Sequence, residues 1–198
     1  MIEPLRAALE HHPAVRSARL AGSRSRGETP TPLSDWDIEV ETDDCPTVAA
    51  DLPALVGVLQ PLAQQWDPYG PDTCYMLMLP EGIKVDLIFP EVPNEVGPPW
   101  DPRPDTLELI DRHFWDWILW LGSKILRGEA DGVQAQFELM WEKLLGPLGV
   151  SEIPSSLEGA IARYKAARAE LERRLEIEVP RDVEDAVLAA LGRAGFAV

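Results

Sequence analysis

The chain has 198 residues, of which 45% are hydrophobic, so it can bury a substantial core as one large domain or two small ones. It carries 18 basic and 34 acidic residues, a formal net charge of −16, the opposite of the basic surface that grips phosphate backbones. A long nucleic acid is therefore disfavoured as a partner, and a cationic small molecule is favoured.

The first half of the chain reads as helices and strands in mixed order. Residues 3 to 12 have helical character, and residues 14 to 21 resemble a short strand that runs into a glycine. In the segment 35 to 40, apolar residues alternate with acidic ones, the period of two expected of a half-buried strand. Residues 47 to 66 are predicted as a helix, although two prolines lie inside the segment.

A hairpin and a proline-rich linker are predicted next. Two apolar runs, 74 to 79 and 84 to 89, are joined by Pro80-Glu81-Gly82, which suits a turn. Residues 92 to 104 then hold five prolines and a glycine, which cannot sustain a helix or a central strand. This composition predicts a domain boundary, with one domain over 1–98 and a second over 99–198.

The second half of the chain is predicted to be helical. Asp105 and Ser155 are each followed three places later by glutamate, the pattern of a capping box at the start of a helix. Candidate helix ends are the glycines at positions 128, 146 and 192. We expect four helices, near residues 105–127, 131–145, 155–176 and 182–192.

Three aspartates fall on predicted strands. Asp35 and Asp37 lie two apart, so their side chains leave the same face, and Asp86 lies in the middle of another strand. Pairing of these strands would bring together three like charges, an arrangement that is improbable as mere structure unless cations neutralise it. Hard divalent cations such as Mg²⁺ are the natural partners. The competing interpretations are a solvent-facing strand edge for the first two and a strand end for Asp86.

A glycine and a serine precede these aspartates. Gly22 ends a predicted strand, where a glycine lets backbone N–H groups approach a phosphate, and the Ser23 hydroxyl can add a donor. The pair alone is uninformative. It gains meaning because eleven residues separate it from the Asp-x-Asp of an alternating strand, and a third aspartate follows in an apolar strand.

This combination resembles the nucleotidyltransferase superfamily that includes DNA polymerase beta and the aminoglycoside nucleotidyltransferases. The matching segments, within roughly residues 14 to 90, are Gly22-Ser-Arg-Ser-Arg-Gly27, Ser34-Asp-Trp-Asp-Ile38 and Val85-Asp-Leu87. The resemblance implies an α+β fold, with a small mixed β-sheet flanked by helices and followed by a C-terminal α-helical bundle that binds substrate.

The resemblance also implies roles for individual residues. Asp35 and Asp37 would bind two Mg²⁺ ions, and Asp86 would bind the ion nearer the acceptor hydroxyl, whose proton it is best placed to accept. Gly22 and Ser23 would hold the triphosphate of an NTP. Further contacts to the phosphates would come from Arg24, Arg26 and Lys124.

Two side chains of the predicted helix 105–127 have competing interpretations. Lys124 lies in a segment similar to the aminoglycoside-type relatives, yet a lysine in a last turn is equally explained by the helix dipole. His113 is more simply a structural residue than a base. An apolar stripe of this helix is expected to face the core, made of Phe114, Ile118, Leu121 and Ile125.

The predicted function is transfer of a nucleoside monophosphate, with AMP preferred, from an NTP to a hydroxyl of a small cationic acceptor such as an aminoglycoside. Pyrophosphate would be released, and antibiotic resistance would result. The alternatives are AMP transfer to a protein or tRNA, as in minimal nucleotidyltransferases of toxin-antitoxin pairs, and a non-catalytic nucleotide-binding module. The acidic net charge disfavours the tRNA version.

The cysteines and the amino terminus bear on location. Cys45 and Cys74 stand in no spacing typical of a disulfide framework or a zinc site. The amino terminus has no basic start followed by an apolar run, and no stretch approaches the roughly 18 apolar residues that a membrane span needs. We therefore expect a cytoplasmic protein, a monomer or homodimer, with no membrane association.

Overall fold

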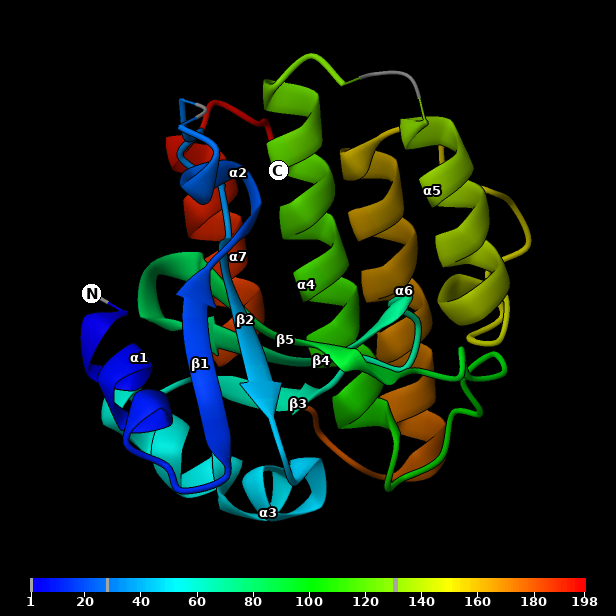
Figure 1. Cartoon of the computed structure of the whole chain (residues 1–198). Coiled ribbons are helices and arrows are strands. Elements are labelled where there is room, and N and C mark those ends of the chain that lie inside the picture. The colour runs from blue at the N-terminus through cyan, green and yellow to red at the C-terminus, as the bar shows by residue number, and fades with distance from the viewer. Residues whose placement is uncertain (1, 28, 130–131) are drawn as a thin grey trace. The chain divides into compact units, whose positions relative to one another are not determined.

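The chain divides into two compact units. The computed structural model describes residues 2–27, 29–129 and 132–198. The first unit comprises Met1–Pro30 and Ser34–Gly97, and the second comprises Thr31–Leu33 and Pro98–Val198. Within the described residues, the strands belong to the first unit and the second is built of helices (Figure 1). None of the helices described is both long enough and apolar enough to cross a membrane.

The first unit contains a mixed five-stranded sheet in the order β1-β2-β5-β4-β3. Strands β2 and β5 are parallel, and the other neighbours pair antiparallel. The strand bounds are β1 Val15–Leu20, β2 Trp36–Thr42, β3 Ala63–Trp66, β4 Asp72–Leu79 and β5 Ile83–Pro93. The α+β prediction, a small mixed sheet with helices and a helical C-terminal part, is confirmed.

Helices α1 (Glu3–Glu10) and α3 (Cys45–Val56) cover one face of this sheet with apolar side chains. Their contributions to the core include Leu5, Leu9, Val48 and Leu52, which pack with Ile38, Val40, Val85 and Leu87 of the sheet. Because side chains alternate along a strand, the residues between these, including Asp37 and Asp86, leave the opposite face. The packing of one face therefore fixes which residues the other face presents.

The segment predicted as a helix over 47–66 is helical only in its first part. Helix α3 ends at Val56, and after the 3₁₀ turn η1 (Gly57–Leu59) the backbone enters the left-handed region at Gln60, with a φ of 50°. Residues 63–66 instead form strand β3, whose Ala63 pairs with Met78 of β4. Sheet pairing thus overrides the helical propensity of this alanine- and leucine-rich stretch.

The second unit packs its helices around buried aromatic rings. The ring of Phe114 stacks on that of Tyr164 at 3.7 Å between centroids, and Trp115 is fully buried beside them. Ile125, predicted to face the core, is instead 37% exposed. The element bounds are α4 Leu107–Leu126, α5 Val133–Met140, the π-helical turn η3 Trp141–Leu145, α6 Leu157–Leu175 and α7 Asp182–Arg193.

Two helix starts and one helix end differ from the predictions. Helix α4 follows Thr106 without a side-chain cap, and Asp105 pairs with Arg103 at 3.1 Å instead. Helix α6 is capped one residue later than expected, because the Ser156 hydroxyl accepts from the Gly159 N–H at 3.0 Å. Gly192 lies inside α7, and Gly195 adopts the positive φ beyond its end.

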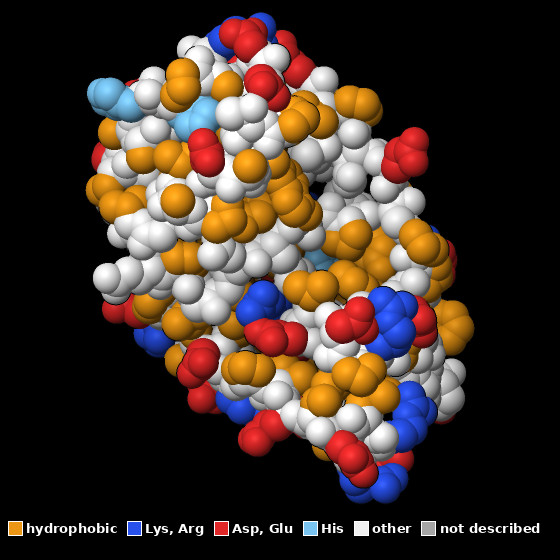
Figure 2. All heavy atoms as spheres, turned by 90° about the horizontal axis from the view of Figure 1, so that it is seen from below, with side chains coloured by type: hydrophobic (Ala, Val, Ile, Leu, Met, Phe, Trp, Pro, Cys, Tyr) orange, Lys and Arg blue, Asp and Glu red, His pale blue; other side chains and the backbone are white. Residues whose placement is uncertain are grey.

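Exposed acidic residues commonly lie beside arginines. On the face drawn in Figure 2, acidic and basic side chains stand next to one another at several places. Arg6, for example, contacts both Glu3 and Glu10, one turn away on either side of it. Such exposed pairs contribute little to the free energy of folding.

Candidate active site

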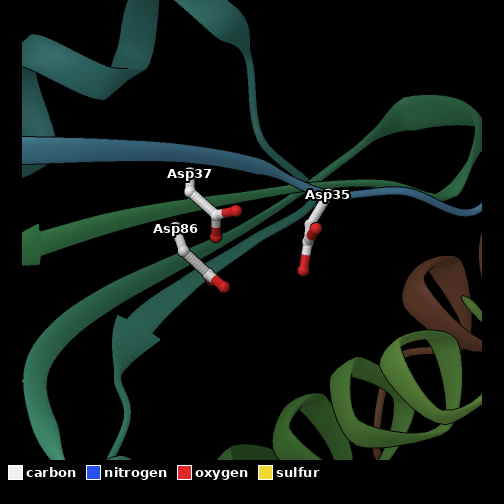
Figure 3. Close-up of side chains that lie close together, drawn as sticks. All are labelled: Asp35, Asp37 and Asp86. Carbon is white, nitrogen blue, oxygen red and sulfur yellow. The ribbon is translucent and has the colours of Figure 1, made fainter. Parts of the chain in front are cut away.

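Two parallel strands bring three carboxylates together. Asp37 of β2 pairs directly with Asp86 of β5, and Asp35 lies two residues before Asp37. One carboxylate oxygen from each of the three lies within 4.8 Å of the others. Figure 3 shows the three carboxyl groups pointing into one space beside the sheet. Oxygen donors at this spacing form the kind of ligand set that a hard divalent cation takes.

Burial and mutual repulsion both act on the carboxylate cluster. Burial, and then the charges of Asp35 and Asp86, raise the pKa of Asp37 to about 7. The positive charges of Lys84 and Arg26 act in the opposite direction on this pKa but do not cancel the shift. A divalent cation placed among the three oxygens would relieve the repulsion, so the residues present fit a metal such as Mg²⁺.

Lys84 lies at the candidate site and was missed by the sequence interpretation. Its Nζ lies 3.0 Å from Asp86 Oδ2, and both side chains are largely buried. The signal was present in the sequence, because Lys84 and Asp86 are two apart on one strand and so leave the same face. The ammonium group is a tethered cation at the edge of the carboxylate cluster.

Gly22 lies directly against the Asp37 carboxylate. The Ala21 N–H donates to the Asp37 carbonyl at 2.8 Å, which ties the end of β1 to β2. Gly22 has a φ of +62°, and a Cβ built on it would lie 1.7 Å from Asp37 Oδ2. Only glycine can adopt this conformation in this space. The neighbouring Ser23 hydroxyl is buried and has no hydrogen-bond partner among the described residues.

The three basic residues predicted to contact phosphates have different surroundings. Arg24 donates to two backbone carbonyls of the segment that leads into β2. Arg26 follows the short helix α2 (Gly22–Ser25), and its positive charge offsets part of the upward shift in the pKa of Asp37. Lys124 belongs to the second unit, where its Nζ lies 2.9 Å from Glu129 and 4.5 Å from the ring centroid of Trp120. Lys124 is therefore held by local contacts at the end of α4.

His113, interpreted as structural from the sequence, is buried within α4. Its ring lies 5.6 Å from that of Trp117, in an edge-to-face contact one turn along the helix.

Comparison with known proteins finds a weak structural similarity. No family model matches the chain, and no curated protein matches it. Among solved structures, the crystal structure of an aminoglycoside 6-adenyltransferase from Bacillus subtilis is similar, with a TM-score of 0.35 and 12% identity over 98% of both chains. Both values are too low for the activity of that protein to be carried over to this one.

Proposed function

We propose that this protein is a divalent-metal-dependent nucleotidyltransferase, which moves a nucleoside monophosphate, preferably AMP, from an NTP to an acceptor hydroxyl. One observation carries the proposal. Three carboxylates from two paired strands converge within 4.8 Å, and the glycine of the upstream Gly-Ser pair packs against one of them. Three like charges around one point repel one another, which favours a site that binds a cation.

The carboxylates have distinct tasks in this proposal. Asp35 and Asp37 would hold two Mg²⁺ ions, and Asp86 would help to hold the one that activates the acceptor. Bound divalent ions would supply the positive charge that activates the attacking oxygen and stabilises the departing pyrophosphate. Asp86 accepts the proton of the acceptor hydroxyl as that oxygen bonds to the α-phosphorus and the bond to the bridging oxygen breaks.

The Gly22–Ser23 segment is proposed to hold the triphosphate. The Ser23 hydroxyl is buried and lacks a hydrogen-bond partner within the described chain, so it is available to donate to a phosphate oxygen. Arg26 supplies positive charge nearby, as its effect on the pKa of Asp37 shows. The phosphate contact implied for Lys124 by the resemblance stays a prediction.

The acceptor is proposed to be a small cationic molecule with free hydroxyls, such as an aminoglycoside. The net charge of −16 supports this class, because an acidic protein attracts polycations and repels nucleic acid. If no small acceptor supports the reaction, the favoured alternatives become AMP transfer to a protein and non-catalytic nucleotide binding.

The test is pyrophosphate release from ATP, GTP, CTP and UTP with Mg²⁺, measured against aminoglycosides and other hydroxylated amines. We expect release that requires both an acceptor and Asp35, so Asp35→Ala should abolish it. Release that persists in Asp35→Ala contradicts the proposed metal site. NTP binding without release across the panel would favour a macromolecular acceptor or a binding module.

A further inference from the structure

Arg24 makes an unusual set of contacts with three consecutive residues. Its Nε donates to the Asp35 carbonyl at 2.7 Å, and its Nη2 donates to the Ser34 carbonyl at 2.7 Å. Its guanidinium carbon lies 4.0 Å from the ring centroid of Trp36. One planar group therefore binds the two carbonyls that flank the Asp35 Cα and stacks on the next side chain, a geometry that lysine cannot reproduce.

The hydrogen bonds of Arg24 are made to Ser34 and Asp35, where sheet pairing does not fix the backbone. Pairing of β2 with β5 begins at Trp36 and fixes Asp37 opposite Asp86. Asp35 precedes the strand, so its backbone is outside that ladder, and the bond from Arg24 is made to its own carbonyl. The position of the Asp35 carboxylate thus depends on Arg24 as well as on β2.

The same contacts connect Asp35 to the Gly22–Ser23 segment. Arg24 belongs to helix α2, two residues after the glycine that packs on the Asp37 carboxylate. The Ala21 N–H binds the Asp37 carbonyl from the other end of this segment. Helix α2 is therefore tied to both aspartates of the Asp-x-Asp pair.

We propose that Arg24 is a positioning residue, whose guanidinium fixes the Ser34–Trp36 backbone so that Asp35 stays within metal-binding reach of Asp37 and Asp86. This inference rests on the proposed function in its metal-binding part. It replaces the phosphate contact that the sequence suggested for Arg24, because two of its donors and one face are already committed to this segment.

The direction in which cation affinity changes when Arg24 is replaced distinguishes a positioning role from an effect of its charge. Arg24 and Arg26 both carry positive charge close to Asp37. Removing a positive charge next to a cation site strengthens cation binding by Coulomb's law alone. Loss of a positioning contact weakens it instead, typically by about 10- to 100-fold for groups that orient metal ligands.

The experiment titrates Mn²⁺ without nucleotide into the full chain and its Arg24→Met, Arg24→Lys and Arg26→Met variants, with Asp37→Ala marking the site. We expect Arg24→Met to bind Mn²⁺ at least about tenfold more weakly, Arg24→Lys to recover little of this, and Arg26→Met to bind as well or better. Hydrogen exchange should show faster exchange of the amides of 35–37 in Arg24→Met. In assays with NTP, the kcat of Arg24→Met should fall, while its KM for NTP stays within about twofold of the unsubstituted protein's.

Other results overturn the inference. Unchanged Mn²⁺ affinity with a raised KM for NTP in Arg24→Met makes Arg24 a phosphate ligand. Unchanged Mn²⁺ affinity with lowered thermal stability alone makes it a structural residue. If the unsubstituted protein binds no Mn²⁺, or if its Mn²⁺ binding survives in Asp37→Ala, both this inference and the proposed function fail. Unchanged amide exchange at 35–37 refutes the backbone contact separately from the function.

Discussion

Gly22 and the Asp37 carboxylate lie so close that a single added methyl group cannot fit between them. In Gly22→Ala the new Cβ would meet Asp37 Oδ2 at 1.7 Å, on a backbone with a φ of +62°. We expect the carboxylate to be displaced, with metal affinity and turnover both reduced by about tenfold or more. Mn²⁺ titration and pyrophosphate release measure the two effects.

Gly27→Ala is the matched control for this substitution. Gly27 has a similar φ of +70°, but a Cβ there would have nothing within 4 Å among the described residues. Both variants carry the strain of alanine in the left-handed region, about 1 kcal/mol. Equal losses of metal affinity in the two variants would show that backbone strain, and not contact with Asp37, is the cause.

Asp37 makes metal binding depend on pH. Its pKa is about 7, so the metal-free carboxyl gains a proton as pH falls below that value, and the proton competes with the cation. Metal affinity should therefore be nearly constant above about pH 8 and fall below about pH 7, approaching a slope of about tenfold per pH unit. Calorimetric Mn²⁺ titrations should detect proton release at about pH 6 and little at about pH 8.5. An affinity that is the same at both pH values would contradict this account of Asp37.

The carboxylates were predictable from the sequence, but some of their neighbours were not. Asp37 and Asp86 could be placed together because the period of two on a strand fixes which face each side chain leaves. Asp35 was expected on the same strand, but β2 begins one residue after it. The contacts of Arg24 could not, since hydrogen bonds to the Ser34 and Asp35 carbonyls depend on how an irregular loop folds back. Lys84 followed the same period as Asp86 and could have been found by the same rule.

Three helices of the second unit are joined by a buried ion-pair network. Arg168 of α6 contacts Asp111 of α4 at 2.6 Å and also Glu184 of α7. Tyr164 donates to the same Asp111 oxygen at 2.6 Å. Arg168→Met would leave the buried Asp111 carboxylate without its cation, whereas Glu184 would keep its ion pair with Lys165 at 2.6 Å. We therefore expect the substitution to lower the free energy of unfolding by about 3–5 kcal/mol. Urea denaturation measures the loss.

Arg173→Met provides the comparison for that substitution. Arg173 lies on the same helix and pairs with Glu170, but both side chains are largely exposed. Its loss should change the urea midpoint little, because solvent already screens the pair. A similar destabilisation of both variants would indicate that helix propensity or packing, and not the buried network, is responsible.

At the scale of elements, strong periodic patterns predicted the structure, and local boundary signals did so only in part. The turn at Pro80–Gly82 and the positive φ of Gly128 after α4 agree with the predictions. The alternation in 35–40 indicated strand β2, which begins at Trp36, and the apolar runs of the second half indicated helices. Strand β3 was missed because four residues are too short to show a period, and its pairing with β4 is decided by the sheet. The cap at Ser156 was displaced by one residue because two serines stand side by side there.

For the whole molecule, net charge should govern encounter with the acceptor. A charge of −16 attracts a polycation over distances set by the ionic strength. Raising salt from about 0.01 M to about 0.15 M shortens the screening length from about 30 Å to about 8 Å. If the acceptor is a polycation, kcat/KM for it should fall several-fold over this range, and kcat should not. An uncharged hydroxylated acceptor is the control, and equal salt dependence for both would remove charge as the basis of selection.

The most direct test of the carboxylate site is anomalous diffraction from crystals soaked in Mn²⁺. We expect an anomalous peak about 2 Å from carboxylate oxygens of Asp35, Asp37 and Asp86, the distance at which small divalent cations bind oxygen. The peak should vanish in Asp37→Ala. Clear density for the three side chains with no peak between them, or a peak that survives this substitution, would contradict the proposed metal centre and the nucleotidyl transfer that depends on it.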